Sequence, residues 1–133
     1  KEYKNMLNEK DIKLFDFEYS LNNILKKVTF CITRAGASTM AELVFFKVPF
    51  LAIPFPHSKD NHQLSNAQFY KEHNCCWIIE QKDVIKINFF ETISHIIADK
   101  KEIEIKKKAM SEFSEKNTWE NNNKLIIKTI YEN

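Results

Sequence analysis

Residues 28–46 read VTFCITRAGASTMAELVFF, and the order of residue types in this stretch decides the fold. The β-rich run Val28–Thr33 predicts a short buried strand of the kind found in parallel sheets. Arg34–Ala37 are expected to form a turn, and Thr39–Phe46 are expected to be helical. A strand, a glycine turn and a helix N-terminus leave backbone N–H groups facing an anion, so this stretch predicts a phosphate or nucleotide site.

Two residues of the turn occur nowhere else in the chain. Gly36 is the only glycine, although an average usage of about 7% would give a chain of this length roughly nine. Glycine is required where φ is positive or where another group approaches closely. Arg34, the only arginine, offers a planar charged fork suited to phosphate or carboxylate. A structural interpretation competes with this one: Thr39 and Glu42 have the spacing of a capping box, with Ser38 or Thr39 as N-cap.

The rest of the chain alternates strands and helices, which predicts an α/β fold with a parallel sheet flanked by helices. Further strands are expected at Ile12–Phe17, Val48–Pro54 and Cys76–Glu80. Helices are expected at Ser20–Lys27 (with Leu21, Ile24 and Leu25 inward), Asn61–His73, Asn88–Asp99, Glu102–Phe113 and Trp119–Tyr131. Ligands on such sheets bind at the carboxyl ends of the strands. Arg34 and the loop 54–60 both follow strand ends, so they should meet at one edge.

Residues 34–67 resemble the nucleotide-sugar-binding half of the MurG family. The family pattern is approximately R-x-G-A-x-T-x-x-E, then a strand ending in P-[FY]-x-H, then D-x-x-Q-x-x-N-A. The chain has the matching residues Arg34, Gly36, Ala37, Thr39, Glu42, Pro54, Phe55, His57, Asp60, Gln63, Asn66 and Ala67. A weaker resemblance runs from about Phe17 to the end of the chain.

The resemblance implies an inverting GT-B glycosyltransferase that transfers N-acetylglucosamine from UDP-GlcNAc to the undecaprenyl-linked muramyl-pentapeptide of peptidoglycan synthesis. It implies that residues 1–133 are one partial Rossmann-like domain, the C-terminal half of such an enzyme. The G-G-S-x-G segment that opens this domain in the family is missing from the sequence, as is the acceptor domain, where the catalytic base is expected. We therefore expect the chain to be part of a longer protein and to be inactive alone.

The resemblance also implies the binding roles of individual residues. The amides of Ala37, Ser38 and Thr39 would face the diphosphate, and Glu42 would accept hydrogen bonds from the ribose hydroxyls. The sugar would be bound by Gln63 and Asn66, with His62 beside them, and the chain at Phe17 and Glu18 would pass the uracil. Arg34 either contacts the ligand or supports the turn, while His57 and Asp60 are expected to shape their loop.

Charge and cysteine usage limit the partners. A net charge of +2 argues against a nucleic-acid footprint, and Lys106–Lys108 are expected to be a solvated face. Three cysteines, two of them adjacent, fit a reducing cytosol. No cofactor or metal is expected, because His57 and His62 have no accompanying C-x-x-C pair. From the resemblance, we expect a lipid-linked acceptor bound through the missing domain and a cytoplasmic enzyme at the inner face of the membrane.

Two other classes stay open from the sequence. The run Asp60–Gln63, D-N-H-Q, also fits the small catalytic subunit of the eukaryotic dolichol-linked GlcNAc transferase, another GT-B enzyme. That family usually has His in place of Arg34. Alternatively, the chain is a non-enzymatic helical interaction domain, in which Gly36 only terminates a local element.

Overall fold

The sheet of this protein has three parallel strands in its described part. The computed structural model describes residues 15, 16, 18–118 and 121. The strands β1 (Cys31–Thr33), β2 (Phe50–Ala52) and β3 (Cys76–Ile78) lie in the order β1-β2-β3. Cys31 is opposite Phe50, and Phe50 is opposite Cys76. This arrangement confirms the predicted α/β class with a parallel sheet.

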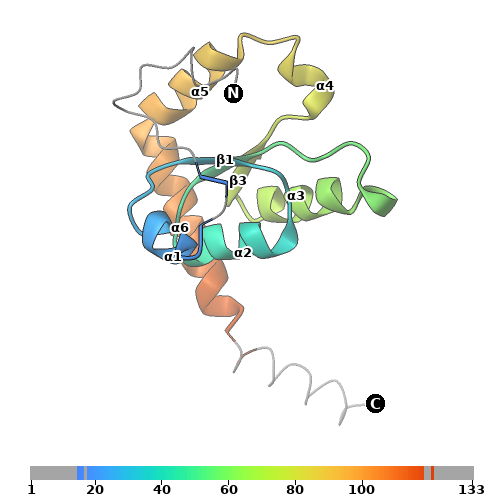
Figure 1. The fold of residues 1–133 in the computed structure, drawn as a ribbon. Coiled ribbons are helices and arrows are strands. Elements are labelled where there is room, and N and C mark those ends of the chain that lie inside the picture. The colour runs from blue at the N-terminus through green and yellow to red at the C-terminus, as the bar shows by residue number, and fades with distance from the viewer. Residues whose placement is uncertain (1–14, 17, 119–120, 122–133) are drawn as a thin grey trace.

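Helices connect and cover the strands (Figure 1). In chain order they are α1 (Leu21–Leu25), α2 (Ala37–Phe45), the 3-10 turn η2 (Lys59–Asn61), α3 (His62–Glu72), α4 (Gln81–Val84), α5 (Phe89–Ala98) and α6 (Lys100–Lys116). Helices α2 and α3 lie on the same side of the sheet, while α4 and α5 lie on the other side (Figure 1). None of the described helices combines the length and apolar character needed to cross a bilayer.

The core lies between one face of the sheet and helices α2, α3 and α6. Side chains alternate along a strand, so Phe50 and Ala52 point toward these helices while Leu51 points away. The fully buried members of the core include Met40, Leu43, Phe50, Ala67 and Met110. Helices α2 and α6 pack against each other over this face. The loops at the strand ends are therefore attached to a well-packed core.

Several predicted boundaries differ from the structure. The strands are shorter than expected, because only three residues of each apolar run pair with a neighbour. In α1 Leu25 is buried as predicted, but Leu21 is 42% exposed, so its inward placement was wrong. The short helix α4 was not predicted. The expected strand Ile12–Phe17 and helix Trp119–Tyr131 lie almost entirely outside the described residues.

Lys106 corrects the prediction of a solvated lysine face. Its side chain is buried in α6, and its ammonium donates a hydrogen bond to Asn74 Oδ1. The same ammonium lies 5.0 Å from the centroid of the Trp77 ring and 3.7 Å from the Glu102 carboxylate. The buried charge is thus stabilised by a hydrogen bond, a cation–π contact and an ion pair. Lys106 therefore joins α6 to β3, whereas Lys108 is exposed as expected.

Candidate functional site

The turn between β1 and α2 has an open, unstrained backbone. Gly36 is the N-cap of α2, with φ −71° and ψ 132°, so positive φ does not explain this glycine. A Cβ built on Gly36 would have Thr39 Oγ1 as its nearest neighbour, at 3.8 Å, an ordinary contact. The first N–H groups of a helix have no acceptor within the helix. The amides of Ala37 and Ser38 therefore stand at an open helix end, in exposed residues.

The predicted capping box is absent from α2. The N-cap is Gly36 rather than Ser38 or Thr39, and no side chain caps the helix. Glu42 lies in the second turn, not in the first turn as expected, and it is exposed. Among the described residues, its carboxylate has no hydrogen-bond or ion-pair partner. Local structure thus does not account for this carboxylate, which remains available to an outside hydroxyl group.

Arg34 links the turn to the two neighbouring loops. Its Nη1 donates hydrogen bonds to the backbone oxygen of Ile53, at 3.2 Å, and to Gln81 Oε1, at 2.7 Å. Its guanidinium carbon lies 5.7 Å from the centroid of the Phe55 ring. Two roles were expected for Arg34, contact with the ligand or support of the turn. Its hydrogen bonds to the neighbouring loops show that Arg34 supports the turn. Sequence reasoning missed Gln81, because no local signal relates residues this far apart in the chain.

The two amide side chains expected to bind a sugar also hold the loops together. Gln63 Oε1 accepts a hydrogen bond from the Phe55 amide at 2.9 Å. Asn66 Nδ2 donates to the backbone oxygen of Ala35 at 3.3 Å and so joins α3 to the β1–α2 turn. Each amide keeps a second polar atom without a partner among the described residues. Gln63 and Asn66 are therefore in place beside the turn, and each side chain can form further hydrogen bonds.

The loop before α3 contains backbone strain instead of glycine. Asp60 has φ 50° and Asn61 has φ 54°, both in the left-handed region. His62 Nδ1 contacts the backbone oxygen of Lys59, which holds its ring over this loop. His57 packs its ring edge-on against Phe55, with the centroids 5.6 Å apart. The ring contacts of both histidines are with their own loop.

The expected uracil-side residues are only partly described. Phe17 lies outside the described residues. Glu18 Oε1 accepts a hydrogen bond from the backbone N–H of Ser20 at 2.7 Å, just before α1. Its carboxylate therefore stabilises the start of that short helix. This contact involves the Glu18 side chain, whereas the prediction for this position is that the chain passes the uracil.

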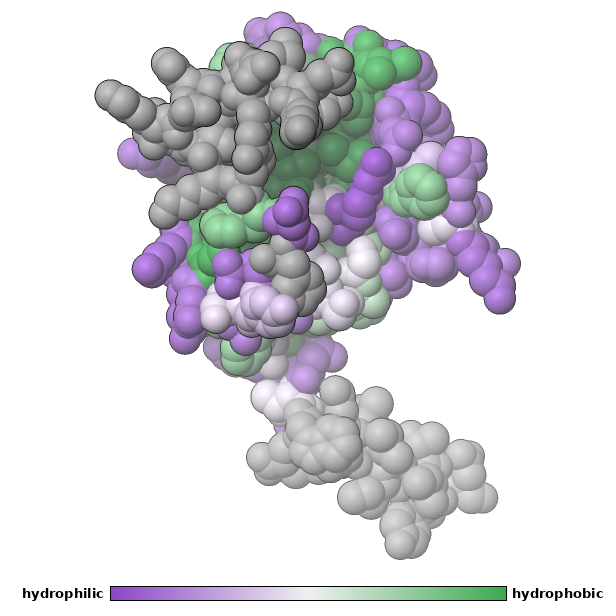
Figure 2. All heavy atoms as spheres, in the orientation of Figure 1, coloured by the Kyte–Doolittle hydropathy of each residue, from purple (hydrophilic) through white to green (hydrophobic). Residues whose placement is uncertain are grey.

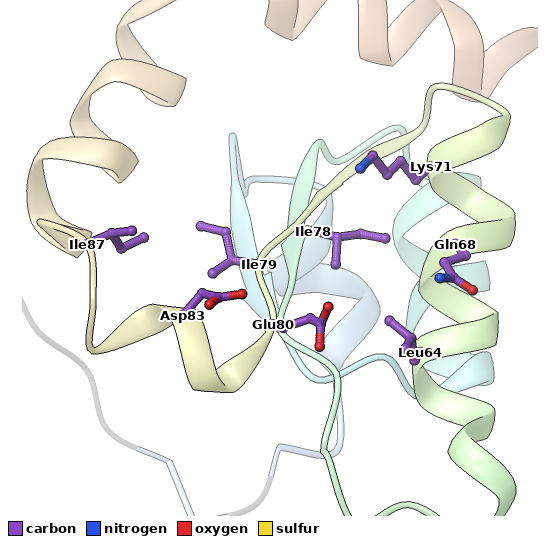
Figure 3. Close-up of a pocket in the computed structure, with 8 residues that line it drawn as sticks. All are labelled: Leu64, Gln68, Lys71, Ile78, Ile79, Glu80, Asp83 and Ile87. Carbon is purple, nitrogen blue, oxygen red and sulfur yellow. The ribbon is translucent and has the colours of Figure 1, made fainter.

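Two hollows open near the carboxyl ends of the strands. One, of about 380 Å³, is lined by Ile32, Thr33, Arg34, Ile53, Gln81, Val84 and Ile85, and Figure 2 shows apolar side chains gathered above the sheet in this region. The other, of about 320 Å³, lies between α3 and α4 and is drawn in Figure 3. It is lined by Leu64, Gln68, Lys71, Ile78, Ile79, Glu80, Asp83 and Ile87. Only the first hollow contains a predicted site residue, Arg34.

The cysteines are free thiols and belong to the core or its border. Burial raises the pKa of Cys75 to about 11 and that of Cys76 to about 12. Burial also raises the pKa of Cys31. Such thiols are protonated near neutral pH and are poor nucleophiles. Across the described part of the chain, no group of three or more His, Cys, Asp or Glu residues is placed to hold a metal ion.

The chain is similar to a known protein family and to individual curated proteins. Residues 1–122 match the family described as glycosyltransferase family 28 C-terminal domain. A curated protein of Pelagibacter ubique, named UDP-N-acetylglucosamine--N-acetylmuramyl-(pentapeptide) pyrophosphoryl-undecaprenol N-acetylglucosamine transferase, is 44% identical over 98% of this chain and 37% of its own length. A protein of the same name from Rickettsia bellii is 35% identical over 69% of this chain and 26% of its own length.

A solved structure has the same fold. The crystal structure of Acinetobacter baumannii MurG matches with a TM-score of 0.63 and 22% identity, over 75% of this chain and 29% of that chain. At this identity the likeness establishes the fold alone. The chain spans about 37% of the length of the Pelagibacter relative.

Proposed function

Because the chain belongs to the glycosyltransferase family 28 C-terminal domain family, we propose that it is the donor-binding domain of a GT-B N-acetylglucosaminyltransferase. Its donor is UDP-GlcNAc, and its acceptor is the lipid-linked muramyl-pentapeptide of peptidoglycan synthesis. The observation that carries this proposal is 44% identity to a protein named for that transfer, over 98% of this chain. The chain spans 37% of that relative, which supports the proposal that residues 1–133 are one partial domain of a longer enzyme.

The diphosphate binds at the open N-terminus of α2. The amides of Ala37, Ser38 and Thr39 donate to its oxygens, and the partial positive charge of the helix end stabilises them. The Thr39 hydroxyl adds another donor. This environment also stabilises the leaving diphosphate when the glycosidic bond breaks, without a metal ion. The missing Cβ of Gly36 leaves room for the phosphates to approach the backbone.

The other two parts of the donor bind on either side of the diphosphate. Glu42, whose carboxylate has no partner among the described residues, accepts hydrogen bonds from the ribose hydroxyls. The sugar binds near the start of α3, where Gln63 and Asn66 each have a polar atom to offer, with His62 beside them. The chain near Phe17 and Glu18 passes the uracil.

The acceptor and the catalytic base belong to the other domain of the enzyme. An inverting transfer needs a base that removes the proton from the attacking acceptor hydroxyl. The lipid-linked acceptor places the reaction at the cytoplasmic face of the membrane, where the enzyme binds peripherally. The dolichol-linked alternative shares the donor but not the acceptor, and the relatives described above are named for undecaprenol-linked transfer. A purely helical interaction domain disagrees with the parallel sheet.

A pair of substitutions at Gln63 tests the assignment of the sugar. Gln63→Ala should lower the turnover of UDP-GlcNAc by the intact enzyme, while inhibition by UDP alone stays nearly unchanged. Gln63→Glu keeps an oxygen for the Phe55 amide but loses the free N–H donor, so it separates the shape of the loop from the contact with the sugar. If inhibition by UDP weakens as much as the use of UDP-GlcNAc in both variants, the sugar assignment is wrong.

A further inference from the structure

One guanidinium joins the three loops at the carboxyl ends of the strands. Arg34 belongs to the turn after β1, Ile53 follows β2, and Gln81 is the first residue of α4, after β3. The contacts of Arg34 with these two residues bridge 19 and 47 positions of sequence. The shorter contact is the one with Gln81, at 2.7 Å. The position of the Arg34 guanidinium, in a residue two places before the N-cap Gly36 of α2, therefore depends on a residue of the third loop.

Both acceptors of the Arg34 guanidinium are electrically neutral. One is a backbone carbonyl and the other is a side-chain amide oxygen. Among the described residues, no carboxylate forms an ion pair with Arg34. The adjacent acidic residue, Glu80, pairs instead with Lys82 at 2.9 Å. Arg34 is thus held in place while its charge stays uncompensated.

A carboxylate in place of Gln81 would hold the same guanidinium more strongly. Charge-assisted pairs between arginine and carboxylate are shorter and stronger than bonds to a neutral amide. Such a pair would also cancel the positive charge of Arg34. Glutamine at this position therefore forms a weaker hydrogen bond to Arg34 than a carboxylate would, but it leaves the positive charge of the turn in place.

We propose that Gln81 is a positioning residue of the donor site, which holds Arg34 in the turn that leads into α2 without neutralising the charge that favours the diphosphate. This inference rests on the proposed function. Gln81 acts through Arg34 and does not itself contact the donor. Under this proposal, the uncompensated guanidinium of the turn and the positive end of α2 both add positive potential at the edge of the sheet where the diphosphate would bind.

Three variants of the intact protein test this role. Gln81→Glu has the same size and keeps the accepting oxygen, but it adds a negative charge next to Arg34. Gln81→Ala releases Arg34 without adding charge. Gln68→Glu is the matched control, because it adds the same charge on α3 in the separate hollow of Figure 3. UDP affinity is measured by titration calorimetry, stability by thermal denaturation, and the KM and kcat for UDP-GlcNAc by steady-state kinetics.

The variants should differ in binding rather than in folding. Gln81→Glu should keep or raise the midpoint of denaturation, yet weaken UDP binding about fivefold or more and raise the KM more than it lowers kcat. This loss should shrink at high salt, which screens charges. Gln81→Ala should weaken UDP binding about twofold to fivefold, because Arg34 becomes mobile. Gln68→Glu should bind UDP like the parent protein.

The possible failures are distinguishable. A purely structural Gln81 predicts that Gln81→Glu binds UDP as tightly as the parent, since the bond to Arg34 is preserved. That result overturns the inference and leaves the proposed function intact. If Gln81→Glu does not fold, parent-like UDP affinity of Gln81→Ala overturns the inference in the same way. If the parent protein binds no UDP, the proposed function fails and the inference fails with it.

Discussion

Two loops at the same edge of the sheet differ in where glycine occurs and in where φ is positive. The turn between β1 and α2 contains the only glycine of the chain, and that glycine has φ −71°, a value open to any residue. The loop before α3 contains no glycine, yet Asp60 and Asn61 have φ of 50° and 54°. Backbone strain therefore lies in one loop and the glycine lies in the other.

The difference separates two reasons for retaining a residue. Asn and Asp tolerate the left-handed region better than other side chains, so the loop 58–62 can meet its backbone requirement without glycine. Gly36 meets no such requirement, and the protein itself leaves room for a Cβ there. Gly36 is also a favourable N-cap of α2, and under the proposed function its missing Cβ lets the diphosphate approach closely. The proposed function accordingly places the diphosphate at the turn, whereas Asp60 and Asn61 are expected to hold the shape of their own loop.

The largest expected effect concerns Glu42, in the helix that follows the Gly36 turn. Glu42→Ala should weaken UDP binding by about 1.5–3 kcal/mol, or about 10- to 150-fold, because charge-assisted hydrogen bonds to the ribose are lost. Its stability should hardly change, since this exposed carboxylate has no partner among the described residues. Titration calorimetry with UDP on both proteins is the measurement. Equal affinities would remove Glu42 from the site.

An intermediate effect is expected at Asn61, in the loop whose residues have positive φ. Asn61→Ala should destabilise the protein by about 1–2 kcal/mol, because alanine is less tolerant of φ 54°. The control Asn61→Gly should be close to neutral, since no side-chain hydrogen bond caps α3 at this residue. Thermal denaturation measures both, and UDP affinity should stay at the parent value. A loss of UDP affinity with unchanged stability would instead give Asn61 itself a role in binding UDP.

Local patterns were sufficient to predict the α/β class and the order of most elements. The apolar runs around Cys31, Phe50 and Cys76 predicted the three strands, although pairing partners decided their lengths. Buried Lys106 was misjudged because its lysine neighbours suggested a solvated face. Helical spacing does place it four residues before buried Met110, on the same side of α6. Its contacts with Asn74 and Trp77 come from distant parts of the chain.

The candidate site was predictable to the same extent. The family pattern indicated the positions of Gly36, Glu42, Gln63 and Asn66. It did not indicate that Gln63 and Asn66 bond to the loops around them, because those contacts depend on how α3 packs beside the turn. The hydrogen bond between Arg34 and Gln81 could not be predicted for the same reason. Contacts between distant loops are set by tertiary packing rather than by local sequence.

Gly36→Ala tests the central claim most directly, because the two explanations of this glycine predict different results. In the absence of ligand, we expect the stability to change by less than about 0.5 kcal/mol, since reduced unfolded-state entropy offsets a poorer N-cap. Titration calorimetry with UDP on the intact parent and variant proteins should show an affinity reduced about tenfold or more, because the added Cβ meets the diphosphate. A variant that keeps the parent's UDP affinity would contradict the account.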